Sequence, residues 1–163
     1  MTAKEYLEQV KQKDARIKNL RRDKASVEDM LYSFGLSRAG GGERVQTSRK
    51  MDKIGELYSR LDEIEHKIDQ QIGELMQFRM KVSCEINELK NEKYMIILNC
   101  RYIHLMSWEK IAENALDHPY TVRHIQKLNG YALLDFEEEY KEMLEAEEKL
   151  RDLEGRSDEE LRP

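Results

Sequence analysis

The fold class follows from residues 51–89, MDKIGELYSRLDEIEHKIDQQIGELMQFRMKVSCEINEL, in a chain of 163 residues. Apolar side chains recur here in alternating steps of three and four residues. Ten of the twelve positions in this seam are apolar, and the exceptions are Glu65 and Arg79. A 3.5-residue period sustained over more than three heptads predicts a long helix in a coiled coil or a helical hairpin. The seam positions are Met51, Ile54, Tyr58, Leu61, Glu65, Ile68, Ile72, Leu75, Arg79, Val82, Ile86 and Leu89.

The preceding residues 1–34 predict another long helix. Its apolar positions follow a similar seam, in which Lys13 and Lys24 fill two positions. The aliphatic stems of these lysines can lie along the seam while their ammonium groups reach water. Between Lys11 and Lys24 the chain holds seven bases and two acids. We interpret this basic stretch either as a solvated helix face or as an arm that contacts phosphate.

Residues 35–49 predict a Gly-rich connector between helix 1–34 and helix 50–88. Gly35 suits the C-cap of the first helix, and the glycine run Gly40–Gly42 cannot continue it. The apolar seam of residues 50–88 has to pack on helix 1–34, on a second copy of the chain in a homodimer, or on both. The slack connector permits each of these arrangements.

The composition also favours an all-α protein. Charged residues make up 37% of the chain and aromatic residues 7%, with only 8 Gly and 2 Pro, which is unlike a β-sandwich or barrel. The net charge of −5 is unevenly placed, because residues 135–163 hold 13 acids and five bases. The first 134 residues therefore carry +3, and residues 137–163 predict an acidic C-terminal helix and tail.

The sequence predicts a cytoplasmic protein. It has no run of 18 apolar residues that would span a membrane, and its N-terminal residues lack the apolar core of a secretory signal. The two cysteines, Cys84 and Cys100, have neither a metal-binding spacing nor the number needed for a disulfide framework. A reduced environment and no membrane partner are therefore expected.

Residues 89–136 change pattern and predict a helix-turn-helix domain. The segment NEKYMIILNCRYI, residues 91–103, is apolar on several sides, as expected for a helix surrounded by neighbours. Ser107 suits the N-cap of a short helix that begins at Trp108, and Thr121 suits the N-cap of the next helix. The order of a buried helix, a short helix, a turn and a further helix is typical of the helix-turn-helix motif.

The helix after Thr121 presents the candidate DNA-binding residues. Its inward side is aliphatic and aromatic, with side chains spaced three or four residues apart. Its first turns expose donors that suit base edges and phosphates, since Arg and Lys bond guanine and Gln bonds adenine. Ordinary solvated side chains are the alternative interpretation. The candidates are Thr121, Arg123, His124, Gln126 and Lys127, opposite the inward residues Ile125, Leu128, Ala132 and Phe136.

Two segments, RYIHLMSWEKIAE (101–113) and IQKLNGYALLDF (125–136), resemble sigma-70 region 4. In particular they are similar to the phage-encoded late transcription regulators of the ArpU/RinA type, which show an Arg-Tyr pair and a Ser-Trp-Glu-x-Ile-Ala helix start. The resemblance covers about residues 88–136, less than a third of the chain. It implies recognition of promoter DNA, with or without bacterial RNA polymerase, by the residues that begin at Thr121.

Two departures separate this chain from that family. The turn from Ala115 to Thr121 is about three residues longer than the usual region 4 turn, a difference that bears on the docking angle of the recognition helix. The histidine that precedes the glycine in the family is Asn129 here, a change that we expect to affect packing more than base recognition.

Catalytic chemistry and bound cofactors find no support in the sequence. Gly40–Gly42 precede neither the Gly-Lys-Ser/Thr of a phosphate loop nor a strand, and no nucleophile elbow is present. The four histidines lack the spacing of a metal site, so no metal is expected. The sequence therefore predicts a DNA-binding, non-enzymatic protein.

Two other functions remain open at this stage. The coiled coil could bind a partner while the C-terminal helices only pack, as in an adaptor or assembly factor. A small terminase subunit also joins a helix-turn-helix to helices that oligomerise.

Overall fold

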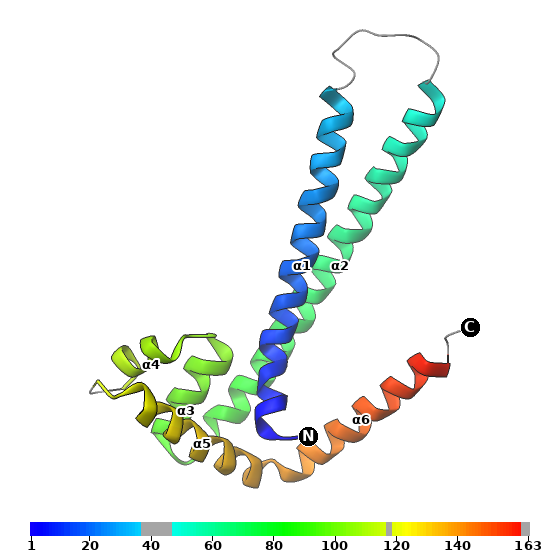
Figure 1. Cartoon of the computed structure of the whole chain (residues 1–163). Helices are drawn as coiled ribbons and strands as arrows, with labels where there is room; N and C mark the ends of the chain where they lie inside the picture. Colours follow the sequence, from blue (N-terminus) through cyan, green and yellow to red (C-terminus); the bar gives the residue numbers. More distant parts are fainter. Residues whose placement is uncertain (37–46, 117–118, 161–163) are drawn as a thin grey trace. The chain divides into compact units, whose positions relative to one another are not determined.

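The computed structural model describes residues 1–36, 47–116 and 119–160, and within these ranges the chain is helical and contains no strand (Figure 1). The predicted all-α class is thereby confirmed. The contacts divide the chain into two compact units. Residues 12–77 form one, here called the hairpin unit, and residues 1–11 with 78–163 form the other, here called the C-terminal unit.

The two long helices are α1, Ala3–Leu36, and α2, Thr47–Asn87. The prediction that Gly35 caps the first helix is wrong, because α1 continues to Leu36. The second helix likewise begins earlier than the predicted residue 50. Of the predicted connector 35–49, the two ends are therefore helical, and residues 37–46 lie outside the described residues.

In the hairpin unit α1 packs against α2, so the seam of α2 is covered by its own chain. The buried centre of this contact is Val27 from α1 with Ile64 and Ile68 from α2. Half-buried leucines and an isoleucine from both helices surround it: Leu20, Leu31, Leu57, Leu61 and Ile72. Because apolar burial is the main term that stabilises such a helix pair, this contact accounts for the predicted seam.

The predicted seam is wrong at two positions in the first half of α2. Tyr58 is 60% exposed and Glu65 is also exposed, whereas the preceding residues Leu57 and Ile64 turn inward. Glu65 instead forms an ion pair with Lys24 at the edge of the hairpin, with 2.8 Å between Lys24 Nζ and Glu65 Oε1. The acidic residue that interrupted the seam therefore lies outside it.

Within its described residues, the C-terminal unit contains four shorter α-helices and one π-helical turn. After α2 come α3, Glu92–Leu98, and the π-helical turn η1, Asn99–Ile103. They are followed by α4, Trp108–Asn114, and α5, Val122–Glu139. The last helix is α6, Lys141–Glu160. Tyr140 separates α5 from α6.

A small apolar core holds α3, α4 and α5 together. Its buried members are Ile97 from α3, Ile111 and Ala112 from α4, and Ile125 from α5. Partly buried side chains from η1, from these helices and from the segments that flank α4 close over it: Cys100, Met106, Trp108, Ala115, Leu116, Tyr120, Val122 and Leu128. This core fixes which side of α5 faces inward.

The ends of both long helices form a further group of buried side chains in this unit. Tyr6 at the start of α1 is fully buried, and its ring lies 5.4 Å from that of Phe78 in α2 and 6.3 Å from that of Phe136 in α5. Val82 and Ile86 near the end of α2 are fully buried as well. The C-terminal unit therefore includes the start of α1 and the end of α2 besides the three short helices.

Arg79, the second interruption of the predicted seam, has a structural partner. It is half-buried, and its guanidinium donates a hydrogen bond to the backbone oxygen of Ile103 at the end of η1. The last carbonyls of a helix lack partners within the helix, so an arginine that reaches them stabilises its end. Arg79 thus links α2 to η1.

Among its described side chains, the acidic helix α6 packs through its first half. Leu144 is buried, whereas Leu150 and Leu153 are 57% and 61% exposed. Among the described residues no helix is long and apolar enough to cross a membrane.

Glu85 supplies a testable electrostatic feature of this unit. The hydroxyl of Tyr6 donates to the Glu85 carboxylate, at 2.9 Å from Oε2. Burial raises the pKa of the Glu85 carboxyl above its ordinary 4.5, and the Tyr6 hydrogen bond and Lys81 only partly oppose this effect. An acid with a raised pKa favours its protonated form in the folded state, so its ionisation costs stability as the pH rises above 4.5.

We therefore expect Glu85→Gln to gain stability relative to the wild type as the pH is raised from 4 to 7. The amide stays neutral and its oxygen still accepts the hydrogen bond from Tyr6. The measurement is the midpoint of thermal unfolding of both proteins at each pH. Glu138→Gln, at an exposed position of α5, is the matched control and should show no such trend. A constant difference between wild type and Glu85→Gln across this range would contradict the prediction.

Candidate nucleic-acid interface

Helix α5 is anchored along one side and open along the other. Ile125, Ala132 and Phe136 on the inward side are fully buried. The five predicted site residues, Thr121, Arg123, His124, Gln126 and Lys127, are all exposed. The structure therefore brings them together at one end of one helix, on the surface of the C-terminal unit.

The start of α5 is fixed by local hydrogen bonds. Thr121 is its N-cap, as predicted, and its hydroxyl accepts from the backbone N–H of His124 at 3.3 Å. The backbone N–H of Tyr120 donates to the oxygen of Ala112 in α4 at 2.9 Å, which ties the turn to the preceding helix. The predicted cap Ser107 likewise accepts from the N–H of Lys110 at the start of α4. Both caps lower the cost of unpaired amides at a helix start.

The side chains at this end of α5 leave their donors available. The side chains of Arg123 and Gln126 form no hydrogen bond or ion pair with any residue that the structure describes. The Lys127 ammonium lies 5.8 Å from the centre of the Tyr131 ring, a cation–π contact that leaves its three N–H donors free. The first turn of α5 contains no acidic residue. This end of α5 is therefore positive through its side chains and through the helix dipole.

An aromatic pair that the sequence analysis missed lies beside these residues. The ring of His124 stacks on that of Tyr120, with 5.0 Å between the centroids and 13° between the planes. Tyr120 directly precedes the N-cap Thr121. The only sequence signal for the stack was an aromatic residue four positions before a histidine. The stack fixes the direction of the His124 ring at the open end of α5.

Arg101 and Asn129, both singled out by the family resemblance, take structural positions. The Arg101 guanidinium lies 4.3 Å from the centre of the Trp108 ring and donates to the oxygen of Met106 at 2.9 Å. It forms no salt bridge within the part of the chain that the structure describes. Asn129 is buried, and its amide lies 3.5 Å from the hydroxyl of Tyr102. Its position agrees with the expectation that this residue affects packing.

The first turn of α4 contains an acidic residue, Glu109. The backbone N–H of Glu109 and the hydroxyl of Ser107 lower the pKa of the Glu109 carboxyl, so it stays ionised at the N-terminus of α4. A carboxylate at this position repels the phosphates that a helix start otherwise attracts. The open cationic end of α5 is therefore the better anion site of this module.

The basic stretch of α1 is partly neutralised within the hairpin unit. Lys24 pairs with Glu65, Lys18 pairs with Asp14 at 2.7 Å, and Lys13 lies 4.0 Å from Glu74. These pairs favour the interpretation as a solvated helix face over that of a phosphate-contacting arm.

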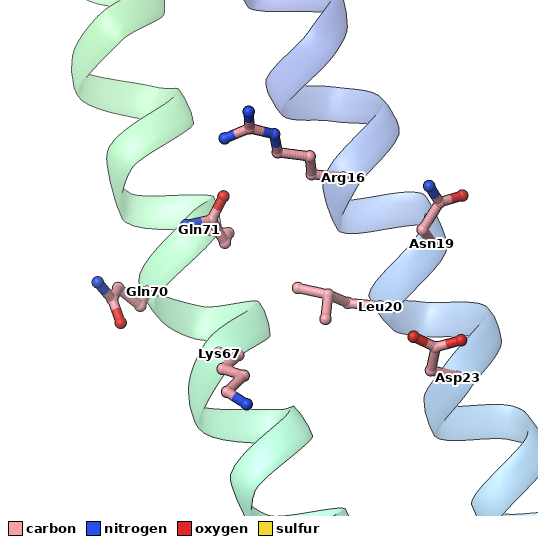
Figure 2. Close-up of a pocket in the computed structure, with 7 residues that line it drawn as sticks. All are labelled: Arg16, Asn19, Leu20, Asp23, Lys67, Gln70 and Gln71. Atoms are coloured by element: carbon pink, nitrogen blue, oxygen red, sulfur yellow. The ribbon is translucent and has the colours of Figure 1, made fainter. Parts of the chain in front are cut away.

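A cleft of about 380 Å³ lies between α1 and α2 in the hairpin unit. Figure 2 shows Arg16 and Leu20 extending from α1 toward α2, and Gln71 on the facing side of α2. The remaining lining residues are Asn19, Asp23, Lys67 and Gln70. Two cations, one carboxylate and three amides give the cleft no dominant charge, so it selects no ligand class.

No protein-family model, curated protein or solved structure matches this chain. The similarity to sigma-70 region 4 therefore stays a prediction from the residues. Among the described residues, no group of three or more His, Cys, Asp and Glu side chains is arranged to hold a metal ion.

Proposed function

We propose that this chain is a DNA-binding transcription regulator that recognises double-stranded DNA through α5. The observation that carries the proposal is the anchoring of α5 by Ile125 and Phe136. Arg123, Gln126 and Lys127 point outward, and their side chains form no hydrogen bond or ion pair with any residue that the structure describes. In this arrangement the cationic side chains supply salt-dependent affinity from phosphates, and base-edge contacts supply specificity.

The sigma-70 region 4-like resemblance refines this proposal. It makes promoter DNA the target, with bacterial RNA polymerase as a further partner, and phage late genes the class of genes controlled. The cytoplasm of a bacterial host is then the place of action. A homodimer through residues 50–88 is part of the proposal too. The apolar seam suggested this dimer, although in the hairpin unit α1 covers that seam.

Selection from a random duplex library tests the proposal. The purified full-length protein is mixed with the library at about 0.1 M salt, and bound duplexes are recovered and sequenced. We expect a shared sequence motif and an affinity for it that falls as salt is raised. Recovery of unenriched sequences, or no recovery at all, would contradict sequence-specific binding by α5.

Light scattering, together with the library selection, distinguishes the proposed function from its two alternatives. A regulator is expected as a monomer or dimer, whereas a terminase subunit would form rings of many copies. An adaptor that acts through its coiled coil would enrich no sequence in the library selection, whatever its oligomeric state.

A further inference from the structure

The outward side of α5 contains a glycine for which the fold gives no reason. Arg123, Lys127, Gly130 and Leu134 recur at steps of four, three and four residues, and all are exposed. We call these four residues the outward stripe. A Cβ added to Gly130 would meet no heavy atom within 4 Å. A glycine inside a helix costs stability relative to alanine, so packing within the chain does not explain its presence.

We infer that Gly130 is the point of closest approach between α5 and the sugar-phosphate backbone of one DNA strand. This inference rests on the proposed function. Gly130 lies nine residues after the N-cap Thr121, or about 13 Å along the helix axis. The major groove is about 12 Å wide. A helix whose first turns reach the base edges would therefore pass a strand of the duplex close to Gly130.

The missing side chain lets the helix axis approach that strand. A Cβ projects about 1.5 Å from the backbone. A Cβ at position 130 would push the axis of α5 away from the strand by about this distance. That shift would lengthen the hydrogen bonds that Gln126 and Lys127, one turn earlier, make to the duplex. Hydrogen bonds weaken steeply beyond about 3.2 Å, so a small shift has a large effect on affinity.

Two other helical glycines provide internal controls. Gly55 and Gly73 in α2 are exposed, and a Cβ at either would also meet no heavy atom within 4 Å. They lie in the hairpin unit, away from the outward stripe in the sequence. Alanine at all three positions should leave the midpoint of thermal unfolding equal to or above that of the wild type, because alanine is the better helix former.

The test measures the affinity of each variant for the duplex selected by the wild type. We expect Gly130→Ala to weaken binding about tenfold, the loss of one good contact to DNA, and Gly130→Leu to weaken it further. Gly55→Ala and Gly73→Ala should bind like the wild type. Wild-type affinity in Gly130→Ala, or a lower unfolding midpoint in that variant, would overturn the inference alone. A wild-type protein that selects no duplex would overturn the proposed function and the inference together.

Discussion

Replacing Arg123 and Lys127 together by alanine is expected to lower the affinity for a selected duplex about 100-fold at physiological salt. Each side chain is exposed and forms no ion pair with an acidic residue that the structure describes, so each can contribute a charged contact of about 1.4 kcal/mol. Each phosphate contact also contributes about −0.9 to the slope of log affinity against log salt. If both cations contact phosphates, the variant should show a slope about 2 units less negative. The measurement is a salt titration followed by gel retardation.

The matched control removes the same charge from the hairpin unit. Lys53 and Arg60 are exposed on α2, and their double alanine variant should keep wild-type affinity within about threefold. The unfolding midpoint should be unchanged in both double variants, because neither removes a buried group. Equal loss of binding in the two variants would mean that overall charge, rather than α5, carries the affinity.

Replacing Phe136 by alanine should cost about 3–5 kcal/mol of folding free energy. Its ring is fully buried in the C-terminal unit, 4.7 Å from that of Tyr140 and 6.3 Å from that of Tyr6. Truncation would remove apolar contacts and leave a cavity where α1 meets α5. For a chain of this size the midpoint of thermal unfolding should fall by roughly 10 °C. Circular dichroism at 222 nm is the measurement.

Tyr131→Ala is the control for this truncation. Tyr131 lies in the same helix but is 46% exposed, so its replacement should change the unfolding midpoint by no more than about 3 °C. Equal destabilisation by the two variants would contradict the packing of Phe136 described above. Loss of stability in Phe136→Ala alone, with α5 still helical at low temperature, would support it.

The helix starts of the C-terminal unit were predictable because capping is a local property. The side-chain oxygen of Ser107 accepts a hydrogen bond from the backbone N–H of Lys110, three residues later. Thr121 accepts in the same way from the N–H of His124. A sequence shows that spacing directly. The exposed set on α5 was predictable for the same reason. One helical turn separates Arg123 from Lys127, whereas Ile125 lies about half a turn from each and so faces the opposite side.

The seam of α2 was predictable in period but not in exact position. A straight helix has 3.6 residues per turn and drifts relative to a 3.5-residue repeat, so adjacent positions exchange roles along a long helix. Leu57 and Ile64 replace Tyr58 and Glu65 on the buried side. Both are more apolar than the residues that they replace, and hydrophobicity at neighbouring positions was the signal that could have found them.

The alternation of apolar and polar residues, together with the caps, was enough to establish a helical protein whose α5 turns Arg123, Gln126 and Lys127 outward. Long-range packing alone revealed that Tyr6 lies beside Phe136, that Arg79 reaches the end of η1, and that α1 covers the seam of α2. The physical reason is range. Periodicity and capping act within about four residues, whereas these contacts join residues at least 24 positions apart, whose partners no local pattern can specify.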